Sequence, residues 1–540
     1  MSKNTAPLFG GANALTRILA GEVGDPKDVA DNLDAQRSGG SPRFQCNNWR
    51  EQFIWWGECS LTNQRLSLFA RGRMIANFDP WEIAMEFELS LTLRENGNEL
   101  MPPAKWAGRM ESNPSVQTLG LSLAQAKTLL TNLQTEIVEQ QVTRMSNRQR
   151  RCLHCGLARK LKDFHEIHYC SLFGDVATRV PRWRACSCNP GRQSVNHGKR
   201  QRWISAELEF VQSRLAACIP YAKSAELLSM LLPATIASSI SAVRRHTLAT
   251  GRHLDRCGLV SEKPAARPVA AVGSTVVGLD GGYLRHCRPE KEQSFEVVAG
   301  RVIQCGADQR SLGFVQTVDA HFKERVRVVL DHFSADPTTI EVFTDGATQL
   351  RQWQIATLPK ARHILDWYHL KTRVAKLCNV VHSKAAGSEL KAFDHDRLSI
   401  AASGLKWRLW HGKSGEALDR LRTILSTTKR PSLLEKATVR FIRKLTVELI
   451  AYLTNNLDSL PNYGQRYRAG QRISSAFVES AVNQLIDKRM SKSQQMRWDP
   501  RCAHQLLQVR VRVVDGQLRD DFARWHSGFP SNDAIIRAVA

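Results

Sequence analysis

The pattern of apolar and polar positions changes several times along the chain. Residues 1–42 are rich in Gly, Asp, Asn and Ser, which predicts a poorly ordered tail. The Trp-rich residues 43–145 contain an alternating segment over 85–93, typical of a half-buried strand, and end in a segment with helical spacing over 122–145. Ser122 is the expected N-cap of that helix. A small packed core is the simpler interpretation of this region, and a DNA-end-binding module is the other.

Residues 204–257 have a helical pattern, with apolar-patterned pieces at about 222–232 and 235–249 and a break at Pro233. A helix-turn-helix, with its second helix in the major groove of DNA, is one interpretation. Two short helices joined by a proline turn would give the same pattern, so this alternative stays open. Residues 258–270 are rich in Pro, Ala and Lys and indicate a linker.

From residue 271 the pattern becomes one of alternating strands and helices. Strands are predicted at 275–279, 295–303, 313–318, 340–344 and 363–365, and helices at 322–333, at 347–356 and from about 367. Three strands followed by alternating helices and strands are the element order of a ribonuclease H-like domain. Residues 371–470 are helical and basic, and one helix is predicted over 473–490.

These patterns predict a multidomain α/β protein. Its ribonuclease H-like core would consist of residues 271–370 and 471–515, with a helical insertion over 371–470 between them. Residues 516–540 would form a C-terminal tail. A length of 540 residues agrees with several domains, because a single hydrophobic core rarely grows that large.

Charge narrows the class of partner. The formal net charge is +25 and the sequence pI is near 9.8, which favours a polyanionic partner. Nucleic acid fits better than a membrane, because no apolar run approaches the roughly 20 residues that a spanning helix requires. The first 30 residues also lack the apolar segment of a signal peptide. A cytosolic or nucleoid location is therefore expected.

Residues 146–203 are strongly basic and contain two close pairs of cysteines. The pairs are Cys152 with Cys155, and Cys186 with Cys188. Two such pairs, brought together by a hairpin, form a zinc ribbon in which four thiolates hold a structural Zn²⁺. The second pair has one intervening residue rather than two, so a substitute ligand stays open: Cys170, His168 or His197. In the alternative interpretation the cysteines are unconnected, and the basic residues bind phosphate nonspecifically.

Three acidic residues stand out by their places in this pattern. Asp280 and Asp345 each follow an apolar strand and precede Gly, and Glu479 lies off the apolar side of the last helix. If the two strands are parallel, both aspartates lie at one sheet edge, and Gly lets the backbone turn away. Paired Mg²⁺ ions, or Mn²⁺, held by such carboxylates promote phosphodiester chemistry. Taken singly, strand–Asp–Gly is an ordinary turn and a lone Glu is usually solvated.

Several segments carry a resemblance to a known family. They are Val277-Gly278-Leu279-Asp280-Gly281-Gly282, Val342-Phe343-Thr344-Asp345-Gly346-Ala347, Asp366-Trp367-Tyr368-His369, Phe477-Val478-Glu479-Ser480-Ala481-Val482-Asn483, Lys488-Arg489-Met490 and Gln494-Gln495-Met496-Arg497-Trp498. Together, over about residues 145–515, they resemble DDE transposases of bacterial insertion sequences, specifically the ISKra group. No single motif is specific for that group.

The resemblance implies metal-dependent DNA cleavage and strand transfer at insertion-sequence ends. Its catalytic and Mg²⁺-binding residues would be Asp280, Asp345 and Glu479, supported by Asp366, His369 and Asn483. DNA is then the partner, and at least a homodimer is expected on DNA because two ends must be brought together. Candidate DNA-binding residues are Arg182, Arg184, Lys199, Arg200, Arg244, Arg245, Lys488 and Arg489.

Two alternative functions are weighed against this one. The first is another ribonuclease H-like enzyme, such as a DNA nuclease or a Holliday-junction resolvase. The basic, cysteine-containing region upstream suits recognition of element ends better than a lone nuclease. The second alternative is a non-catalytic, transposase-derived DNA-binding regulator, and an intact acidic triad argues against it.

Overall fold

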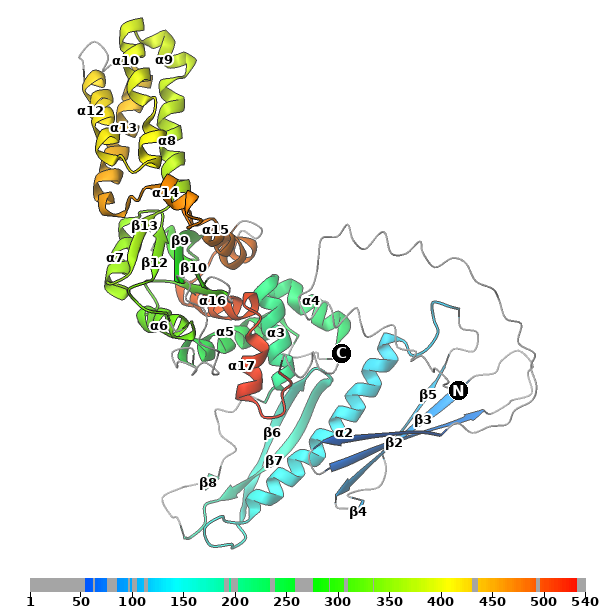
Figure 1. Ribbon diagram of the computed structural model, residues 1–540. Helices are drawn as coiled ribbons and strands as arrows, with labels where there is room; N and C mark the ends of the chain where they lie inside the picture. The colour runs from blue at the N-terminus through cyan, green and yellow to red at the C-terminus, as the bar shows by residue number, and fades with distance from the viewer. Residues whose placement is uncertain are drawn as a thin grey trace, which may run out of the picture. The chain divides into compact units, whose positions relative to one another are not determined.

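A computed structural model describes the chain from residue 54 to residue 531 with several gaps (Figure 1). The described residues are 54–61, 64–74, 85–95, 98–99, 104–110, 115–188, 194–195, 203–233, 238–257, 275–290, 292–304, 309–333, 335–429, 436–491 and 496–531. The tail predicted over 1–42 and the linker predicted over 258–270 lie outside them. Two compact units are distinguished, Met1–Arg109 and Met110–Ala540, and each is described by itself.

The first unit is an antiparallel sheet. Its strands are β1 (Ile54–Leu61), β2 (Gln64–Met74), β3 (Met85–Glu95), β4 (Asn98–Glu99) and β5 (Ala104–Arg109). β2 and β5 pair with the two edges of β3, and β1 pairs with β2. The strand predicted from the alternation over 85–93 is therefore confirmed, and Leu91 on it is buried.

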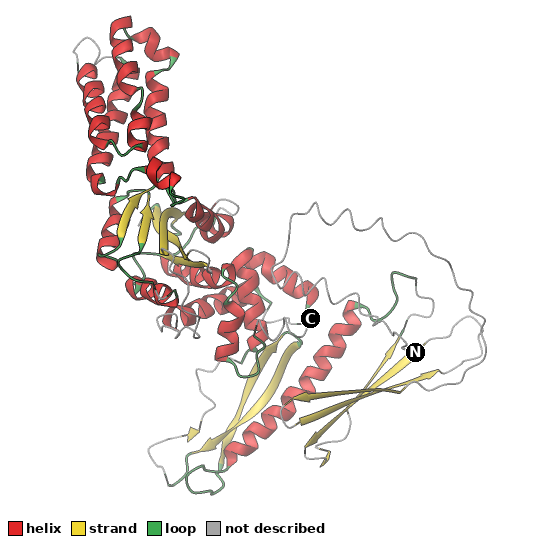
Figure 2. Ribbon diagram, viewed as in Figure 1, coloured by secondary structure: helices red, strands yellow, loops and turns green. Residues whose placement is uncertain are grey.

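The second unit begins with a long helix packed on a hairpin (Figure 2). Helix α2 (Leu123–Arg150) starts at the predicted N-cap, where Ser122 and Gln125 form a reciprocal capping box. The hairpin consists of β6 (Leu161–Ser171) and β7 (Gly174–Arg184), and β7 also pairs with the short β8 (Ser194–Val195). Apolar residues of the helix and the hairpin share one small core: Val138, Val142, Ile167, Val176 and Val180.

Five helices of the second unit pack together, three that follow the hairpin in sequence and two from near the C-terminus. They are α3 (Ala206–Cys218), α4 (Tyr221–Leu231), α5 (Ile240–Cys257), α16 (Pro500–Val514) and α17 (Leu518–Trp525). The helix predicted over 235–249 thus begins and ends later, as α5. It touches α16 so closely that a Cβ on Gly251 would lie 2.1 Å from the carbonyl oxygen of Gln505. The expected tail after residue 516 is corrected by α17, whose Leu518 and Phe522 are buried.

A five-stranded mixed sheet is the centre of the second unit. Its strands are β9 (Thr275–Arg285), β10 (Ser294–Gln304), β11 (Gln309–Phe314), β12 (Glu341–Thr344) and β13 (Arg362–Leu365), in the order β11-β10-β9-β12-β13. β10 pairs in antiparallel fashion with both β9 and β11, whereas β9, β12 and β13 run parallel to one another. Helices α6 (Phe322–His332) and α7 (Thr348–Thr357) cover one face, and helices near the C-terminus, among them α16, cover the other.

Two strand boundaries differ from the sequence prediction. β11 covers 309–314 instead of 313–318, because the chain turns after Phe314 and the N–H groups of Val318 and Asp319 both bond to the carbonyl of Val315. β9 does not end at Asp280 but runs on to Arg285, paired with β10 throughout. The glycines after Asp280 are therefore strand residues and not a turn.

The helical insertion has its own apolar core. Its helices are α8 (Trp367–Val381), α9 (Lys384–Glu389), α10 (Ala392–Ala402), α11 (Leu405–Trp410), α12 (Ser414–Thr428), α13 (Ala437–Asn455) and α14 (Tyr463–Arg468), with a 3-10 turn, η3 (Leu457–Ser459). The helical character predicted for 371–470 is confirmed. The main-chain N–H of Trp367 donates to the carbonyl of Ile473 at 3.1 Å, so the two ends of the insertion meet.

The helix predicted over 473–490 is shorter at its start and changes type. It begins as α15 (Ala476–Val482) and continues as a π-helix, η4 (Asn483–Ser491). Residues 473–475 precede the helix: the carbonyl of Ile473 accepts the N–H of Trp367 at the start of α8, and Ser475 is the N-cap of α15. Among the described residues, none of the helices is both long and apolar enough to cross a membrane.

Candidate zinc and acidic sites

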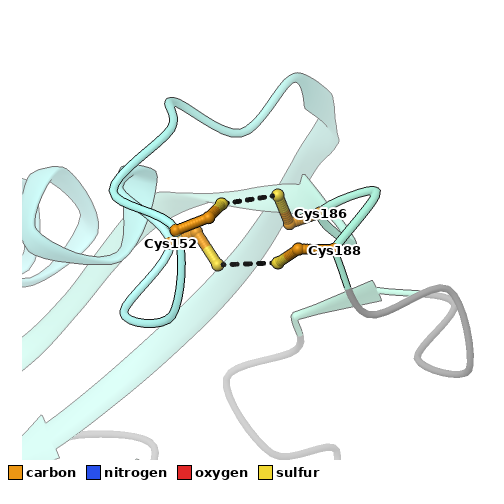
Figure 3. A group of neighbouring side chains, drawn as sticks. Cys152, Cys186 and Cys188 are labelled. Carbon is orange, nitrogen blue, oxygen red and sulfur yellow. Dashed lines mark hydrogen bonds between the residues drawn. The ribbon is translucent and has the colours of Figure 1, made fainter.

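Four cysteines from two distant stretches converge at the open end of the β6–β7 hairpin. The two stretches supply Cys152 with Cys155, and Cys186 with Cys188, and all four sulfur atoms lie within 4.8 Å of one another. Figure 3 shows Cys152, Cys186 and Cys188 pointing toward one another. The sulfur atoms of Cys152 and Cys188 are 3.6 Å apart, and those of Cys155 and Cys186 are 3.2 Å apart. Four thiolates around Zn²⁺ lie roughly 3.8 Å apart, so this set fits the ion.

Local backbone geometry prepares the first cysteine pair. Gly156 has a φ of +72°, which lets the chain fold back so that its N–H reaches the carbonyl of Cys152 at 2.9 Å. The N–H groups of Cys155 and His154 lower the pKa of the Cys152 thiol to about 6. Contact with Cys186, and then with the other two thiols, raises the pKa of Cys188 to about 12. A bound cation would favour thiolate at all four positions.

The alternative ligands are not part of this cluster. Cys170 lies along β6 in half-buried surroundings that raise its pKa to about 12, and His168 on the same strand is exposed. His197 lies outside the described residues. The four-cysteine set is therefore the one that the structure brings together.

Asp280 lies on β9, and Asp345 directly follows the neighbouring parallel strand β12. In the pairing of β12 with β9, Phe343 is opposite Gly278, and continuing this register by two residues places Asp345 beside Asp280. Both residues are half-buried. Burial raises the pKa of Asp280, the charge of His369 and the N–H of Gly281 lower it, and Asp345 and Asp366 raise it further. The two carboxylates therefore feel each other's charge, which agrees with their predicted placement at one edge of the sheet.

The glycines around Asp280 let α15 lie close to the sheet. A Cβ on Gly278 would lie 1.9 Å from a methyl group of Val478, and one on Gly282 would lie 3.2 Å from Ile486. Gly278, Asp280 and Gly282 share one face of β9, since side chains alternate along a strand. Glu479 follows Val478 directly and is exposed. The helix is thus held against the face that carries Asp280, although the side chain of Glu479 points into solvent.

Asp366 ties the start of α8 to the start of α15. It is almost fully buried, caps α8 through the N–H of Tyr368 at 2.7 Å, and accepts a hydrogen bond from Ser475, the N-cap of α15. His369 lies one turn along α8, with its Nε2 atom 3.7 Å from a carboxylate oxygen of Asp366. The Asp366–His369 pair thus lies at the N-terminus of α15, the helix that carries Glu479. It is also near enough to Asp280 for its charges to shift the pKa of that residue. Asn483, predicted as a supporting residue, is exposed at the start of η4.

The main chain around Asp345 is held from several sides. The Asp345 carboxylate accepts the N–H of Ala347 at 2.8 Å, which fixes the turn into α7. From α13, Tyr452 donates to the carbonyl of Asp345 at 2.7 Å, and Asn456 reaches the carbonyl of Gly346 at 3.4 Å. Gly346 has a φ of +81°, a conformation that glycine adopts without strain.

One acidic neighbour escaped the sequence analysis. Glu296 on β10 lies beside Gly281, where a Cβ would be 2.8 Å from its carboxylate oxygen. Burial raises the pKa of Glu296, and the charge of Asp345 raises it further. The signal in the sequence was the one acid in the mostly apolar strand segment 295–303, but a charged residue at a half-exposed strand position is common.

The acidic residues are not gathered as tightly as the cysteines. Among the described residues, the groups whose ligand atoms lie within 4.8 Å do not include Asp280, Asp345 and Glu479 together. In this structure the two aspartates are adjacent. Glu479 lies on the neighbouring helix α15, and its side chain does not contact them. Metal binding by all three would require the Glu479 side chain to turn toward the sheet.

A second group with ligand atoms within 4.8 Å consists of Asp255, Asp319 and His504. These groups suit a divalent metal, but Arg325 already lies among them, donating to Asp319 at 3.0 Å and to Asp255 at 2.5 Å. His504 accepts the N–H of Val315 on Nδ1, so its Nε2 carries the proton and donates to Asp255. The group is a buried ion-pair network that joins α5, α6 and α16.

In comparisons with known proteins, no protein-family model and no curated protein matches this chain. The function is therefore argued from the residues and geometry of the chain itself.

The predicted DNA-binding residues fall into different surroundings. Arg184, Arg244, Arg245 and Lys488 are exposed. Arg182 is half-buried and pairs with Asp163 on the neighbouring strand. Lys199 and Arg200 lie outside the described residues. α5, the second helix of the proposed helix-turn-helix, buries one side against α3 and α16 and leaves Arg244 and Arg245 exposed.

The prediction that Arg489 binds DNA is wrong. Its side chain is fully buried in η4, where it donates to the carbonyl of Ala216 at 2.9 Å. Its guanidinium lies between the rings of Tyr221 and Trp498, 5.1 and 5.5 Å from their centroids. This basic residue therefore packs the C-terminal helices onto α3 and α4. The sequence could not show this, because its neighbour Lys488 is exposed.

Replacing Arg489 and Lys488 one at a time should separate the two roles. Arg489→Ala should lower the free energy of unfolding by about 3 kcal/mol, since it removes a buried cation and leaves the Ala216 carbonyl unpaired. Lys488→Ala should leave stability within about 0.5 kcal/mol of the native value and weaken DNA binding. Thermal unfolding and DNA titrations of both variants test this. An Arg489→Ala protein of native stability would contradict the packing role.

Proposed function

We propose that the chain is a DDE transposase, which cuts DNA at insertion-sequence ends and transfers the freed strand to target DNA. The observation that carries this proposal is the placement of Asp280 on β9 and of Asp345 just after the adjacent parallel strand β12, beside the buried Asp366 and its partner His369. Two carboxylates on rigid strands are suited to hold divalent metal ions. A strongly basic chain supplies the attraction for DNA.

The sheet supports a ribonuclease H-like core for the proposed enzyme. Three antiparallel strands are followed by two parallel ones, in the spatial order third, second, first, fourth and fifth. The insertion enters after the fifth strand and returns directly to α15. This arrangement returns the chain to the sheet next to the two aspartates, which is the place where a third metal ligand is needed.

Asp280, Asp345 and Glu479 would hold Mg²⁺ or Mn²⁺. Glu296 is near enough for its charge to interact with that of Asp345. The metal, when bound, would activate water or a 3′-hydroxyl and stabilise the leaving oxygen. The chain itself contributes the fixed carbonyl and carboxylate positions around Asp345, and His369 contributes an imidazole whose charge lowers the pKa of Asp280. The half-buried setting limits water around the reacting phosphate, which strengthens these charge interactions.

The proposed roles of the other parts follow from their charge and exposure. The four-cysteine cluster would bind a structural Zn²⁺ and fix the basic β6–β7 hairpin as a DNA-binding platform. Arg184, Arg244, Arg245 and Lys488 are the exposed cations that we assign to phosphate contacts. Two element ends would require two active sites, so we propose that the enzyme acts as at least a homodimer on DNA.

A cleavage and joining assay tests the function directly. Purified protein is incubated with labelled fragments of the DNA that flanks the coding region on each side, a target plasmid, and Mg²⁺ or Mn²⁺. The expected result is a 3′-hydroxyl at a fixed boundary and joining of that end to the plasmid, lost in EDTA. A nuclease or resolvase would cut without joining, and a regulator would bind the ends without cutting. Either outcome would replace the proposal.

A further inference from the structure

Helix α10 of the insertion carries an apolar stripe on its outer face. Its inner face, with the buried Leu398, Ala401 and Ala402, packs against α8 and α12. On the outer face, Phe393 is 68% exposed, and Ile400, two turns further along, is 67% exposed. A helix of this kind usually turns polar residues to solvent, so two large apolar side chains aligned on the outer face are unusual. Such a stripe is typical of a helix that packs against another protein surface.

Two opposite charges lie between these apolar side chains. Asp396 and Arg397 are both exposed, and they occupy the helical turn that separates Phe393 from Ile400. The two charges cancel, whereas α13 of the same insertion carries three cations against one acid. DNA phosphates attract surfaces with an excess of cations, and the centre of this stripe has none. Apolar side chains with balanced charges therefore favour a protein as the partner of α10.

A groove lies beside the stripe, between α10 and α12. It has a volume of about 540 Å³, and α12 contributes Arg420 and Thr423 to its wall. Arg420 is held in place, because its guanidinium donates to the carbonyls of Ile400 and Ser403 at 2.6 and 2.7 Å. The groove thus has a fixed wall next to Ile400, and it leaves room for a side chain that projects from a partner.

The stripe is complementary to a second copy of itself. Along α10 its order is apolar, acidic, basic, apolar, so a copy that runs the other way offers the opposite charge at each central position. In an antiparallel pair with a two-fold axis between positions 396 and 397, Phe393 is level with the partner's Ile400. The same axis brings Asp396 level with the partner's Arg397. Each apolar side chain then meets an apolar one, and each charge is within reach of an opposite charge.

We propose that α10 is a contact surface between two copies of this chain, which pair antiparallel through Phe393, Asp396, Arg397 and Ile400. This contact assigns a surface to the proposed homodimer, but it needs neither DNA nor metal and does not rest on DNA cleavage. A helix of 11 residues forms a small interface, so we expect weak association, with a Kd on the order of 10 µM. Two copies bound to one DNA would associate more completely, because their local concentration is higher.

Sedimentation velocity of the full-length protein without DNA, over a range of concentrations, tests the contact. Asp396→Arg brings four positive charges to the centre of the pair, and Arg397→Asp brings four negative ones. Each variant alone should raise the dimer Kd by about tenfold or more, because like charges repel across the axis. An equal mixture of the two variants should associate with a Kd within about threefold of the native value, because opposite charges meet again.

Matched controls come from α13 of the same insertion. Ile400→Glu should raise the dimer Kd by about tenfold, because it places a charge against the partner's Phe393. Val447→Glu, at an exposed apolar position of α13, and Glu448→Arg, at an exposed acid of α13, should leave the Kd at its native value. If either α10 charge variant fails to fold, Ile400→Glu against Val447→Glu decides the same question.

Three results would overturn the inference: native protein that stays monomeric up to about 100 µM, charge variants that associate as the native protein does, or a mixture that fails to associate. Cleavage is a separate readout. A protein that never cuts DNA but pairs through α10 would keep this contact while the proposed transposase function fell. A protein that cuts and joins DNA but shows no association through α10 would keep the function and lose the contact.

Discussion

Asp280→Asn is expected to reduce metal-dependent DNA cleavage by about a thousandfold or more while leaving the fold and DNA binding intact. Asn keeps the size of Asp, and its side-chain oxygen can still accept the N–H of Gly281, which Asp280 holds at 2.8 Å. What disappears is the negative charge beside Asp345, and with it a ligand for a hard cation. Cleavage of labelled element ends at matched protein concentrations measures the loss.

The same assay ranks the other acids. Glu479→Gln should lose cleavage as completely as Asp280→Asn if its exposed side chain turns to the metal, and Glu296→Gln should reduce it less. Glu324 is exposed on α6, on the opposite face of the sheet, and Glu324→Gln should cleave normally. An active Glu479→Gln would show that Glu479 is not the third ligand. Full activity of Asp280→Asn would remove the acidic site altogether.

Cys152→Ser is expected to release zinc and loosen the β6–β7 hairpin. Native protein should contain about one Zn per chain, and the variant about none, because a hydroxyl cannot replace a thiolate in a tetrahedral zinc site. Cys152 is the buried member of the cluster, so its loss also leaves a polar group in an apolar place. Structural zinc contributes on the order of 10 kcal/mol of binding free energy to such modules, so the hairpin should become sensitive to proteases.

Metal analysis of the purified protein, together with limited proteolysis, measures both effects. Cys218→Ser is the control, since Cys218 is an exposed cysteine at the end of α3, outside the cluster. The control should keep its zinc and its protease resistance. Native protein without zinc, or Cys152→Ser with native zinc content, would show that the four thiols do not form a metal centre.

Some parts of the structure follow from short-range signals in the sequence. The N-cap at Ser122, the strand at β10 and the helical insertion all arise from patterns within a few residues, and they fold as predicted. The two cysteine pairs are far apart in sequence, but a zinc ribbon needs a hairpin between them, and the β6–β7 hairpin does return its ends to one place. The adjacency of Asp280 and Asp345 followed from parallel strands in the same way.

Other parts depend on contacts that no local pattern contains. Gly281 and Gly282 look like a turn, yet pairing with β10 and the approach of Ile486 keep them in the strand. Arg489 looks like a surface cation, yet two rings and the carbonyl of Ala216 hold it inside. The position of Glu479 depends on how α15 packs against β9 and β10. In each case the deciding partner lies far away in the sequence.

Two hydrogen bonds connect the end of α13 to the main chain of Asp345 and Gly346, so a movement of the insertion is transmitted to the acidic site. α13 has 19 residues and is about 28 Å long, and Tyr452 and Asn456 are at its C-terminal end. A ligand that tilts α13 must move the Asp345 carbonyl. Such a ligand would then change the affinity of the acidic residues for a metal ion. By thermodynamic linkage, the metal ion would change the affinity for that ligand by the same factor. Ligand binding to the insertion and metal binding at the acidic residues are in this way thermodynamically coupled.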